Sequence, residues 1–408
     1  MHAHPTPGAR LEIAEVFRRF AGGYRDKHAP AGPAARVLGD LERCRTAALG
    51  EHLWHCHECS RDVPLFNSCL NRHCPTCQGP AQYRWIEQRQ RRLLDTSYFH
   101  VVFTLPAILR PVVFAHRRAL LDLLFRAASQ TLLAFAADPK WLGAQLGFTL
   151  VLHTWTRELL FHPHLHAIVT GGGLSPEGAN WVAVRNDEFL FPVSALSKVF
   201  RGKFLDGFRA LGAAGKLDLT DHQSRKLVRE TYKHDWVVYA KKPFGGPEQI
   251  VRYLGRYTHR VGISSSRLLS VTDDRIVFRT RGEKTCSLAP DEFLRRFLLH
   301  VLPPRFSKIR HYGLLAPGNV HTRLVLAQEL LGTAPVHAEP LEPVRTVLDD
   351  PRAPESLAAS RTDADDDNDE RNAVDPAAPR CPHCGGRLIR LAAPVSRRPQ
   401  RAPPVASP

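Results

Sequence analysis

Residues 158–174 read ELLFHPHLHAIVTGGGL, a stretch in which alternating histidines run into an apolar strand. On a strand, side chains two residues apart point to the same face of the sheet. His164 and His166 are therefore expected to project together on one face, while Leu165 and Ala167 point into the core. Two neighbouring imidazoles at a sheet surface supply half of a divalent-cation site and leave positions open for a substrate. The alternative is a pair of histidines with purely structural hydrogen bonds.

The residues at the two ends of this strand each have more than one interpretation. His162 belongs to the same face by alternation, but Pro163 can break the strand between His162 and His164. The glycines at 171–173 predict a turn at the end of the strand, although such a run would also let a DNA strand approach the backbone closely.

The sequence around this strand alternates between short apolar strands and longer amphipathic helices. Expected strands lie at 98–106, 146–155, 162–171, 235–243, 268–272, 275–280 and 284–288. Expected helices cover two segments within 11–49 and then 83–94, 112–136, 194–211, 222–233, 247–259, 290–301 and 319–331. The strands outnumber the helices that could cross over between them, and several are close enough to form hairpins. The pattern therefore predicts an α+β fold with an antiparallel sheet.

The chain is strongly basic. Its 408 residues carry a formal net charge of +16, and the pI is about 9.8. Residues 362–370 hold six acids without a lysine or arginine, so the rest of the chain is more basic still. A positive electrostatic field of this strength attracts polyanions. It favours a nucleic-acid partner over the alternative of an enzyme that is merely basic.

Length and hydropathy set expectations for the domains and the compartment. With 43% hydrophobic residues, a chain of this length can form two or three domains with a buried core. Beyond about residue 335 the sequence is rich in Pro, Ala, Asp and Arg, which predicts a mostly disordered tail. The N-terminus MHAHPTPGAR lacks the apolar core of a signal peptide, and no apolar run reaches about 18 residues. We therefore expect a cytoplasmic protein with no membrane partner.

Two pairs of cysteines have the spacing of zinc knuckles. Cys56 and Cys59 form one C-x-x-C pair, and Cys74 and Cys77 form another, with fourteen residues between the two pairs. Two such pairs supply the four tetrahedral ligands of a structural Zn²⁺, which is more plausible than disulfides in a reducing compartment. A closed four-ligand site leaves no position for a substrate. We expect it to present the basic helix at 83–94 to DNA, and the alternative is that it only stabilises the N-terminal fold.

Other residues leave the zinc ligand set open. His55, Cys69 and His73 are additional candidates close to the two pairs. Cys381 and Cys384 form half of a further knuckle with no second pair after it. That half knuckle could bind a metal together with ligands from elsewhere in this chain, complete a site in another chain, or bind nothing.

Two tyrosines share one face of the helix expected at 247–259. Gln249, Tyr253 and Tyr257 are four residues apart, so their side chains stack along the same face. A tyrosine can act as a covalent nucleophile, and a neighbouring metal ion would polarise the phosphoryl oxygen. The basic residues Arg252, Arg256, His259 and Arg260 around the phenols suit a phosphate backbone. The alternative is a pair of half-buried packing residues.

These residues together resemble a known family. His164-Leu165-His166 matches the HUH motif, and Tyr253-x-x-x-Tyr257 matches the two-tyrosine motif of rolling-circle nucleases. More narrowly, the chain resembles transposases of rolling-circle insertion sequences, of the insertion-sequence-91 type. The matching segments, in the expected order, are CRTAALGEH, NSCLNRHCPTCQ, LHTW, HPHLHAIVTGGGL, YLGRYTHRVGIS and IRHYGLLA. The chain departs from the family at Gly262 and Ser265, where Ala and Asn are expected.

The resemblance implies a chemistry. His164 and His166 would bind Mg²⁺ or Mn²⁺, and Tyr253 and Tyr257 would attack single-stranded DNA at the ends of a mobile element, leaving a 5′-phosphotyrosine and a free 3′-hydroxyl. The third metal ligand is expected to be Gln249. Further possible third ligands are Glu158, His153 and His162.

The same resemblance implies three regions: a zinc-binding, DNA-binding domain at 1–95, a nuclease domain at 96–335, and a mostly disordered tail with a C-x-x-C knuckle at 336–408. Its partners would be element-end and target DNA, with host replication proteins possible, and the protein would associate with the nucleoid when bound to DNA.

Two rival functions remain. The first is a non-catalytic zinc-dependent DNA-binding protein, such as a decayed transposase, which would bind DNA without capturing it covalently. The second is a zinc hydrolase that uses the histidines with Glu158, which explains neither the basic charge nor the tyrosine helix.

Overall fold

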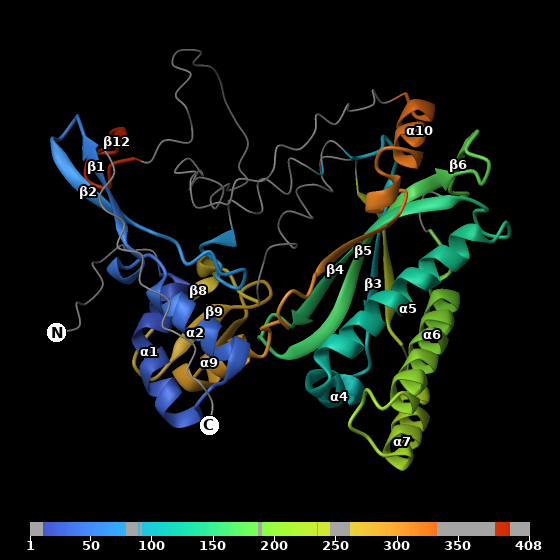
Figure 1. Cartoon of the computed structure of the whole chain (residues 1–408), viewed down its shortest axis with the longest axis horizontal. Helices are drawn as coiled ribbons and strands as arrows, with labels where there is room; N and C mark the ends of the chain where they lie inside the picture. Colours follow the sequence, from blue (N-terminus) through green and yellow to red (C-terminus); the bar gives the residue numbers. More distant parts are fainter. Residues whose placement is uncertain are drawn as a thin grey trace. The chain divides into compact units, whose positions relative to one another are not determined.

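The computed structural model describes residues 11–78, 89, 92–186, 190–234, 236–244, 262–332 and 380–391. The chain divides into two compact units, which are drawn in Figure 1. The N-terminal unit contains residues 1–82, 263–298 and 339–408, and the sheet unit contains residues 83–262 and 299–338. These bounds differ from the expected ones, which placed residues 263–298 in the nuclease domain and residues 83–95 in the N-terminal domain.

Helices from two distant parts of the sequence form the core of the N-terminal unit. Its elements are α1 (Ile13–His28), α2 (Gly32–Arg43), η1 (Ala47–Leu49), η3 (Ser265–Arg267), β8 (Leu268–Val271), β9 (Ile276–Arg279), β10 (Thr285–Leu288) and α9 (Pro290–Leu298). Apolar residues three and four apart give α1 and α9 a buried stripe each. Phe17 of α1 meets Phe297 of α9 edge to face, with ring centroids 5.0 Å apart, and Lys27 pairs with Asp291 at 2.9 Å. These contacts explain why residues 263–298 belong to this unit.

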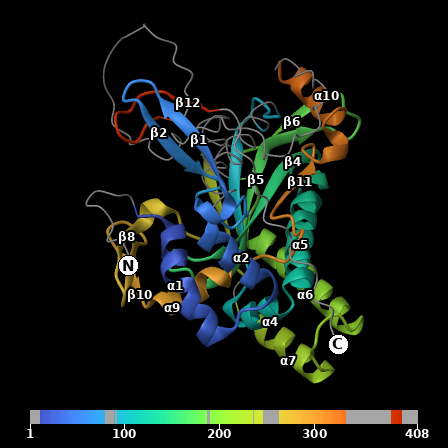
Figure 2. The same ribbon diagram turned by 60° about the vertical axis from the view of Figure 1, so that its left-hand side comes forward.

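The N-terminal unit also contains a small three-stranded antiparallel sheet. Strands β1 (Glu51–Cys56) and β2 (Arg61–Phe66) form a hairpin, and β12 (Leu388–Arg390) pairs with the other edge of β1. Figure 2 shows the three strands side by side. The sequence pattern predicts none of these strands, because they are short, with three to six residues each.

The sheet unit is built on six antiparallel strands among the described residues, in the order β11-β4-β5-β3-β7 with β6 paired to β5. The strands are β3 (Tyr98–Thr104), β4 (Gln145–Trp155), β5 (Phe161–Leu174), β6 (Trp181–Ala183), β7 (Val238–Phe244) and β11 (Ile309–Gly313). The helical elements are η2 (Ala107–Leu109), α4 (Arg110–Ala115), α5 (Arg117–Ala137), α6 (Val193–Ala213), α7 (Asp221–Tyr232), η4 (Pro317–Asn319) and α10 (Arg323–Leu330). The predicted α+β class with an antiparallel sheet is confirmed.

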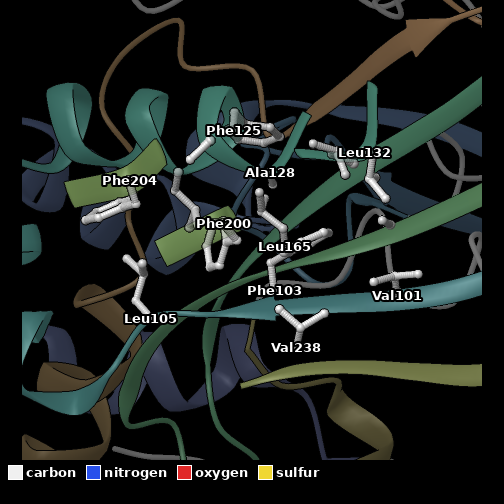
Figure 3. Close-up of a cluster of buried hydrophobic side chains, with 14 of the residues drawn as sticks. Val101, Phe103, Leu105, Phe125, Ala128, Leu132, Leu165, Phe200, Phe204 and Val238 are labelled. Atoms are coloured by element: carbon white, nitrogen blue, oxygen red, sulfur yellow. The ribbon is translucent and has the colours of Figure 1, made fainter. Parts of the chain in front are cut away.

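Helices α5 and α6 lie side by side over one face of the sheet (Figure 1). In the core beneath them, Leu165 and Phe103 of the sheet pack with Phe125 of α5 and Phe200 of α6 (Figure 3). Helix α5 is long and apolar enough to cross a membrane, but 67% of its most apolar window is buried inside the protein. This burial is what a core helix requires.

Strand β5 extends through all three glycines to Leu174, so the turn expected at 171–173 is wrong. A Cβ atom on Gly171 would lie 2.0 Å from Oγ of Ser97, and one on Gly173 would lie 2.6 Å from the carbonyl oxygen of Gln145. Neighbouring segments therefore approach this part of the strand too closely for any side chain.

Candidate functional site

Three histidines meet on the face of the sheet opposite α5 and α6. His153 of β4 lies directly across from His164 of β5, and His166 follows two residues further along β5 on the same face. Each offers a ring nitrogen, and these nitrogens all lie within 4.8 Å of one another. We call this set the histidine cluster. It brings the expected pair together and adds His153, which sequence analysis ranked below Gln249.

Hydrogen bonds orient the two rings of β5. Nδ1 of His164 lies 2.7 Å from the carbonyl oxygen of His162, and Nδ1 of His166 lies 2.8 Å from Nε2 of His100 on β3. Because Nδ1 of each ring is engaged, Nε2 is the nitrogen through which either ring would bind an ion. A bound ion on Nε2 leaves the hydrogen on Nδ1, which then donates to His162 or His100. Partners of this kind fix the tautomer and direction of metal-binding histidines.

The electrostatics of the cluster favour neutral rings. Burial lowers the pKa of His164 to about 4. Burial and the neighbouring histidines hold the pKa of His166 well below its usual value. Only a neutral imidazole has a lone pair for a metal, so at neutral pH these rings are in the binding form. The three imidazoles thus fit a divalent cation.

Two other candidate ligands lie outside the cluster. Nδ1 of His162 contacts Nη2 of Arg110 at 2.7 Å, and burial together with this guanidinium lowers its pKa. Glu158 is exposed in the turn between β4 and β5 and does not join the three histidines. Its position offers no support for a zinc hydrolase that uses Glu158.

The expected tyrosine helix lies outside the described residues. Its candidate residues are Gln249, Arg252, Tyr253, Arg256, Tyr257, His259 and Arg260, all within 245–261. Their roles therefore stay predictions.

The four cysteines expected to bind one zinc are divided between two clusters. Cys74 and Cys77 meet Cys44 and Cys69, and we call these four thiols the first cysteine cluster. Cys56 and Cys59 meet Cys381 and Cys384 in the second cysteine cluster. The two C-x-x-C pairs therefore lie in separate cysteine clusters and not in the single cluster that was expected.

The first cysteine cluster has the dimensions of a tetrahedral zinc site. Its Sγ atoms are 3.5 Å apart for Cys44 and Cys77, 3.6 Å for Cys69 and Cys77, and 3.6 Å for Cys44 and Cys74. A tetrahedron with Zn–S bonds of about 2.3 Å has edges of about 3.8 Å, whereas a disulfide bond measures about 2.0 Å.

The remaining zinc candidates have other contacts. His55 pairs with Asp62, with 2.7 Å between Nδ1 and Oδ1. Nδ1 of His73 lies 3.1 Å from Oδ1 of Asn71. Neither histidine joins a cysteine cluster. Cys69 does, and Cys44 is a ligand candidate that sequence analysis missed because it has no C-x-x-C partner.

Two groups of basic side chains in the described part of the sheet unit are candidates for DNA contacts. Of the basic helix expected at 83–94, the structure describes Arg89 and residues 92–94. Burial, followed by the charges of Arg89 and Arg92, lowers the pKa of His311 on β11 to about 3. The second place is a groove of about 520 Å³ along α6 and α7, which we call the basic groove. It is lined by Arg209, Ser224, Arg225, Val228, Arg229, Tyr232 and Lys233.

The basic groove keeps a net positive charge. Asp206 pairs with Arg209 at 2.7 Å, and Glu230 pairs with Lys233 at 3.1 Å. These two acids face four basic side chains of the lining. The guanidinium of Arg201 lies over the ring of Tyr232, 4.0 Å from its centroid, and adds a further positive charge beside the groove.

Known proteins resemble both parts of the chain. Residues 16–105 match the family described as "Transposase zinc-binding domain", and residues 147–323 match the family described as "Putative transposase". A relative from Sinorhizobium fredii (strain NBRC 101917 / NGR234), "Putative transposase y4qJ", is 45% identical over 79% of this chain and 84% of its own length. The "Transposase for insertion sequence element IS801" of Pseudomonas savastanoi pv. phaseolicola is 32% identical over 72% of each chain.

Among solved structures, a metal-bound conjugative relaxase TrwC in complex with oriT DNA matches 40% of this chain and 71% of its own, at 17% identity and a TM-score of 0.24. That likeness is too distant to carry an argument about this chain.

Proposed function

Because the chain belongs to the insertion-sequence-91 (IS91) type of DNA transposases, with an N-terminal zinc-binding domain, we propose that it nicks and joins single-stranded DNA at the ends of its element. The histidine cluster is the observation that carries this proposal. Three imidazoles on adjacent strands, two of them oriented through Nδ1, suit a divalent ion that keeps open positions for a phosphate.

His153, His164 and His166 would hold this ion. When bound, it would polarise the scissile phosphate and neutralise developing negative charge. Imidazole nitrogens suit Mn²⁺ better than Mg²⁺, which prefers oxygen ligands and keeps much of its water. We therefore expect Mn²⁺ to support the reaction at lower concentration than Mg²⁺ does.

The proposed nucleophiles are Tyr253 and Tyr257. The phenol oxygen of one tyrosine attacks the phosphorus atom, and the bond from phosphorus to the 3′ oxygen breaks. The phenol gives up its proton, and the departing 3′ oxygen takes up a proton, so the products are a 5′-phosphotyrosine and a 3′-hydroxyl. Attack by another 3′-hydroxyl on the phosphotyrosine restores a phosphodiester and frees the tyrosine. Each transfer conserves the bond, and no nucleotide triphosphate is required.

Contacts to the DNA backbone are assigned to basic residues in two places. Arg252, Arg256 and Arg260 accompany the tyrosines in the sequence and would bind phosphates next to the scissile bond. The basic groove offers further guanidinium groups on α6 and α7 with a tyrosine between them. Positive grooves with aromatic side chains are typical of proteins that bind single strands.

Covalent capture of DNA tests the proposal. The full chain is incubated with Mn²⁺ and end-labelled single-stranded DNA that contains candidate element ends, and protein-linked label is separated on a denaturing gel. We expect a labelled band with the wild-type protein. The double variant Tyr253→Phe with Tyr257→Phe should lose it, and so should His164→Ala with His166→Ala.

The matched control is Tyr239→Phe. Tyr239 is an exposed tyrosine of β7, and strand pairing places it across from Val102, which itself lies across from His166. It therefore shares the face of the histidine cluster, and its variant should keep the labelled band. Loss of the band in Tyr239→Phe would indicate that Tyr239, and not Tyr253 or Tyr257, is the nucleophile. DNA binding without any covalent band would favour the non-catalytic DNA-binding protein.

A further inference from the structure

The second cysteine cluster joins two segments that are far apart in the sequence. Cys56 and Cys59 lie at the end of β1 and in the turn after it, whereas Cys381 and Cys384 lie more than 300 residues later. Sγ of Cys56 is 3.4 Å from Sγ of Cys384, and Sγ of Cys59 is 3.7 Å from Sγ of Cys381. These distances are near the edge of about 3.8 Å in a tetrahedral zinc–thiolate site.

The backbone around the C-terminal pair forms a knuckle. The N–H of Cys381 donates to the carbonyl oxygen of Gly386 at 2.7 Å, and the N–H of Gly385 donates to the carbonyl oxygen of Cys381 at 2.9 Å. Gly385 has a φ of 77°, in the left-handed region that favours glycine. The turn thereby brings both thiols to the same side, which is how C-x-x-C pairs hold zinc.

Strand pairing continues from this knuckle. Cys56 of β1 lies across from Leu388 of β12, and Trp54 lies across from Arg390. The N–H of Leu391 donates to the carbonyl oxygen of Leu53 at 3.0 Å and extends the ladder. The C-terminal segment is thus the third strand of the small sheet, with the four thiols at one end.

The apolar core of this sheet is very small. It consists of the buried residues Trp54, Cys56, Val63, Cys381 and Leu388. Two of the five are themselves in the cysteine cluster, and β12 contributes only one buried side chain. Small β units of this kind generally depend on a metal or a disulfide, and the free energy of metal binding then becomes free energy of folding.

We propose that Cys56, Cys59, Cys381 and Cys384 bind a second structural Zn²⁺, which closes a zinc ribbon from two distant segments of the chain. The zinc-binding family match covers residues 16–105 and does not include the C-terminal pair. Four thiolates around one zinc leave no position for a substrate, so this site ties the C-terminal strand to β1. Because the two pairs of ligands are more than 300 residues apart, the ribbon forms only after Cys384 has been synthesised.

Metal content is the direct test. The full chain, purified without chelator, should contain two zinc ions, one for each cysteine cluster. In the full-length double variant Cys381→Ser with Cys384→Ser the content should fall to one per chain. The control is Cys286→Ser, since Cys286 belongs to neither cluster and its variant should keep both ions. A wild-type content of one ion, or two ions retained in the double variant, would overturn the proposal.

A second measurement uses only the wild-type protein, so it does not depend on a variant that folds. The metal-free chain is titrated with Co²⁺, and absorption from thiolate-to-cobalt charge transfer should rise until two equivalents are bound. Chelation should then increase hydrogen exchange at Leu391, whose amide pairs with β1. Three results would contradict a ribbon closed within one chain. They are saturation at one equivalent of Co²⁺, hydrogen exchange at Leu391 that does not change on chelation, and a second ion found only in dimers.

Discussion

Replacing His100 by leucine tests how the histidine cluster is held. His100 is buried on β3, with Nε2 2.8 Å from Nδ1 of His166 and the two rings parallel at a centroid distance of 5.0 Å. Leucine fills much of the space but removes the acceptor. An ion on Nε2 of His166 would fix the hydrogen on Nδ1, where it would meet an apolar side chain. A buried donor without an acceptor costs about 1–3 kcal/mol, and the loss of such outer partners typically weakens metal binding by about 10–100-fold.

Mn²⁺ binding to the purified variants, measured by calorimetry, reports this effect directly. His100→Leu should bind Mn²⁺ about 10–100-fold more weakly than wild type. His100→Gln, whose amide oxygen can accept the same hydrogen bond, should recover part of the affinity. The control is His222→Ala, which removes an exposed histidine of α7 and should change nothing. The reasoning is refuted if His100→Leu, still folded by circular dichroism, binds Mn²⁺ within about twofold of wild type while His164→Ala does not bind.

Three further predictions concern stability and DNA binding. Gly173→Ala should lower the free energy of unfolding by about 1–3 kcal/mol in urea, because its Cβ would lie 2.6 Å from the backbone of β4, whereas Gly202→Ala, in open space on α6, should stabilise by up to about 1 kcal/mol. Burial lowers the pKa of His300 to about 4, below its unfolded value of about 6.5. The contribution of the neutral His300 ring to the free energy of unfolding is therefore complete above about pH 6.5 and is lost as the pH falls toward about 4. The melting temperature should fall across this pH range, and it should fall less steeply in His300→Gln. Arg225→Gln with Arg229→Gln should reduce the salt dependence of single-stranded DNA binding by about 0.7 for each phosphate that the variant no longer neutralises, and an unchanged slope in fluorescence anisotropy would remove the basic groove from the DNA path.

The alternation of histidines and buried apolar residues along β5 was predictable, because it is a local property of the chain. His164 and His166 are two residues apart, and their apolar neighbours Leu165 and Ala167 identify the face that is buried. His153 could be suspected but not assigned from the sequence. Its place opposite His164 depends on the register between β4 and β5, which shifts between His153 and Trp155. Strand pairing sets that register, and no local spacing records it.

The cysteines illustrate a different limit. Spacing identified the C-x-x-C pairs, because each pair forms one local turn, but it did not determine which pairs share an ion. Cys59 and Cys381 are 322 residues apart, yet their thiols are neighbours. The entropic cost of closing a loop grows only slowly with its length, so proximity in the sequence is a weak guide to the partner. Cys44 was missed because a single cysteine has no spacing signal.

The conformations of the glycine run at 171–173 and of strand β11 are set by neighbouring segments and not by the local sequence. Glycines predict a turn when only the backbone is considered, whereas at 171–173 the decisive fact is the close approach of neighbouring segments. Strand β11 at Ile309–Gly313 was not predicted, because all five residues are partly exposed and show no alternation. It is defined by its pairing with β4.

The most direct test of the proposed transposase chemistry is to locate the covalent bond to DNA. The full chain is trapped with Mn²⁺ and single-stranded element-end DNA, digested with nuclease and protease, and sequenced by tandem mass spectrometry. We predict a nucleotide joined through its 5′ phosphate to Tyr253 or Tyr257, and no such adduct in the His164→Ala with His166→Ala variant. A nucleotide on any other residue, or an adduct that forms without the histidines, would contradict this prediction.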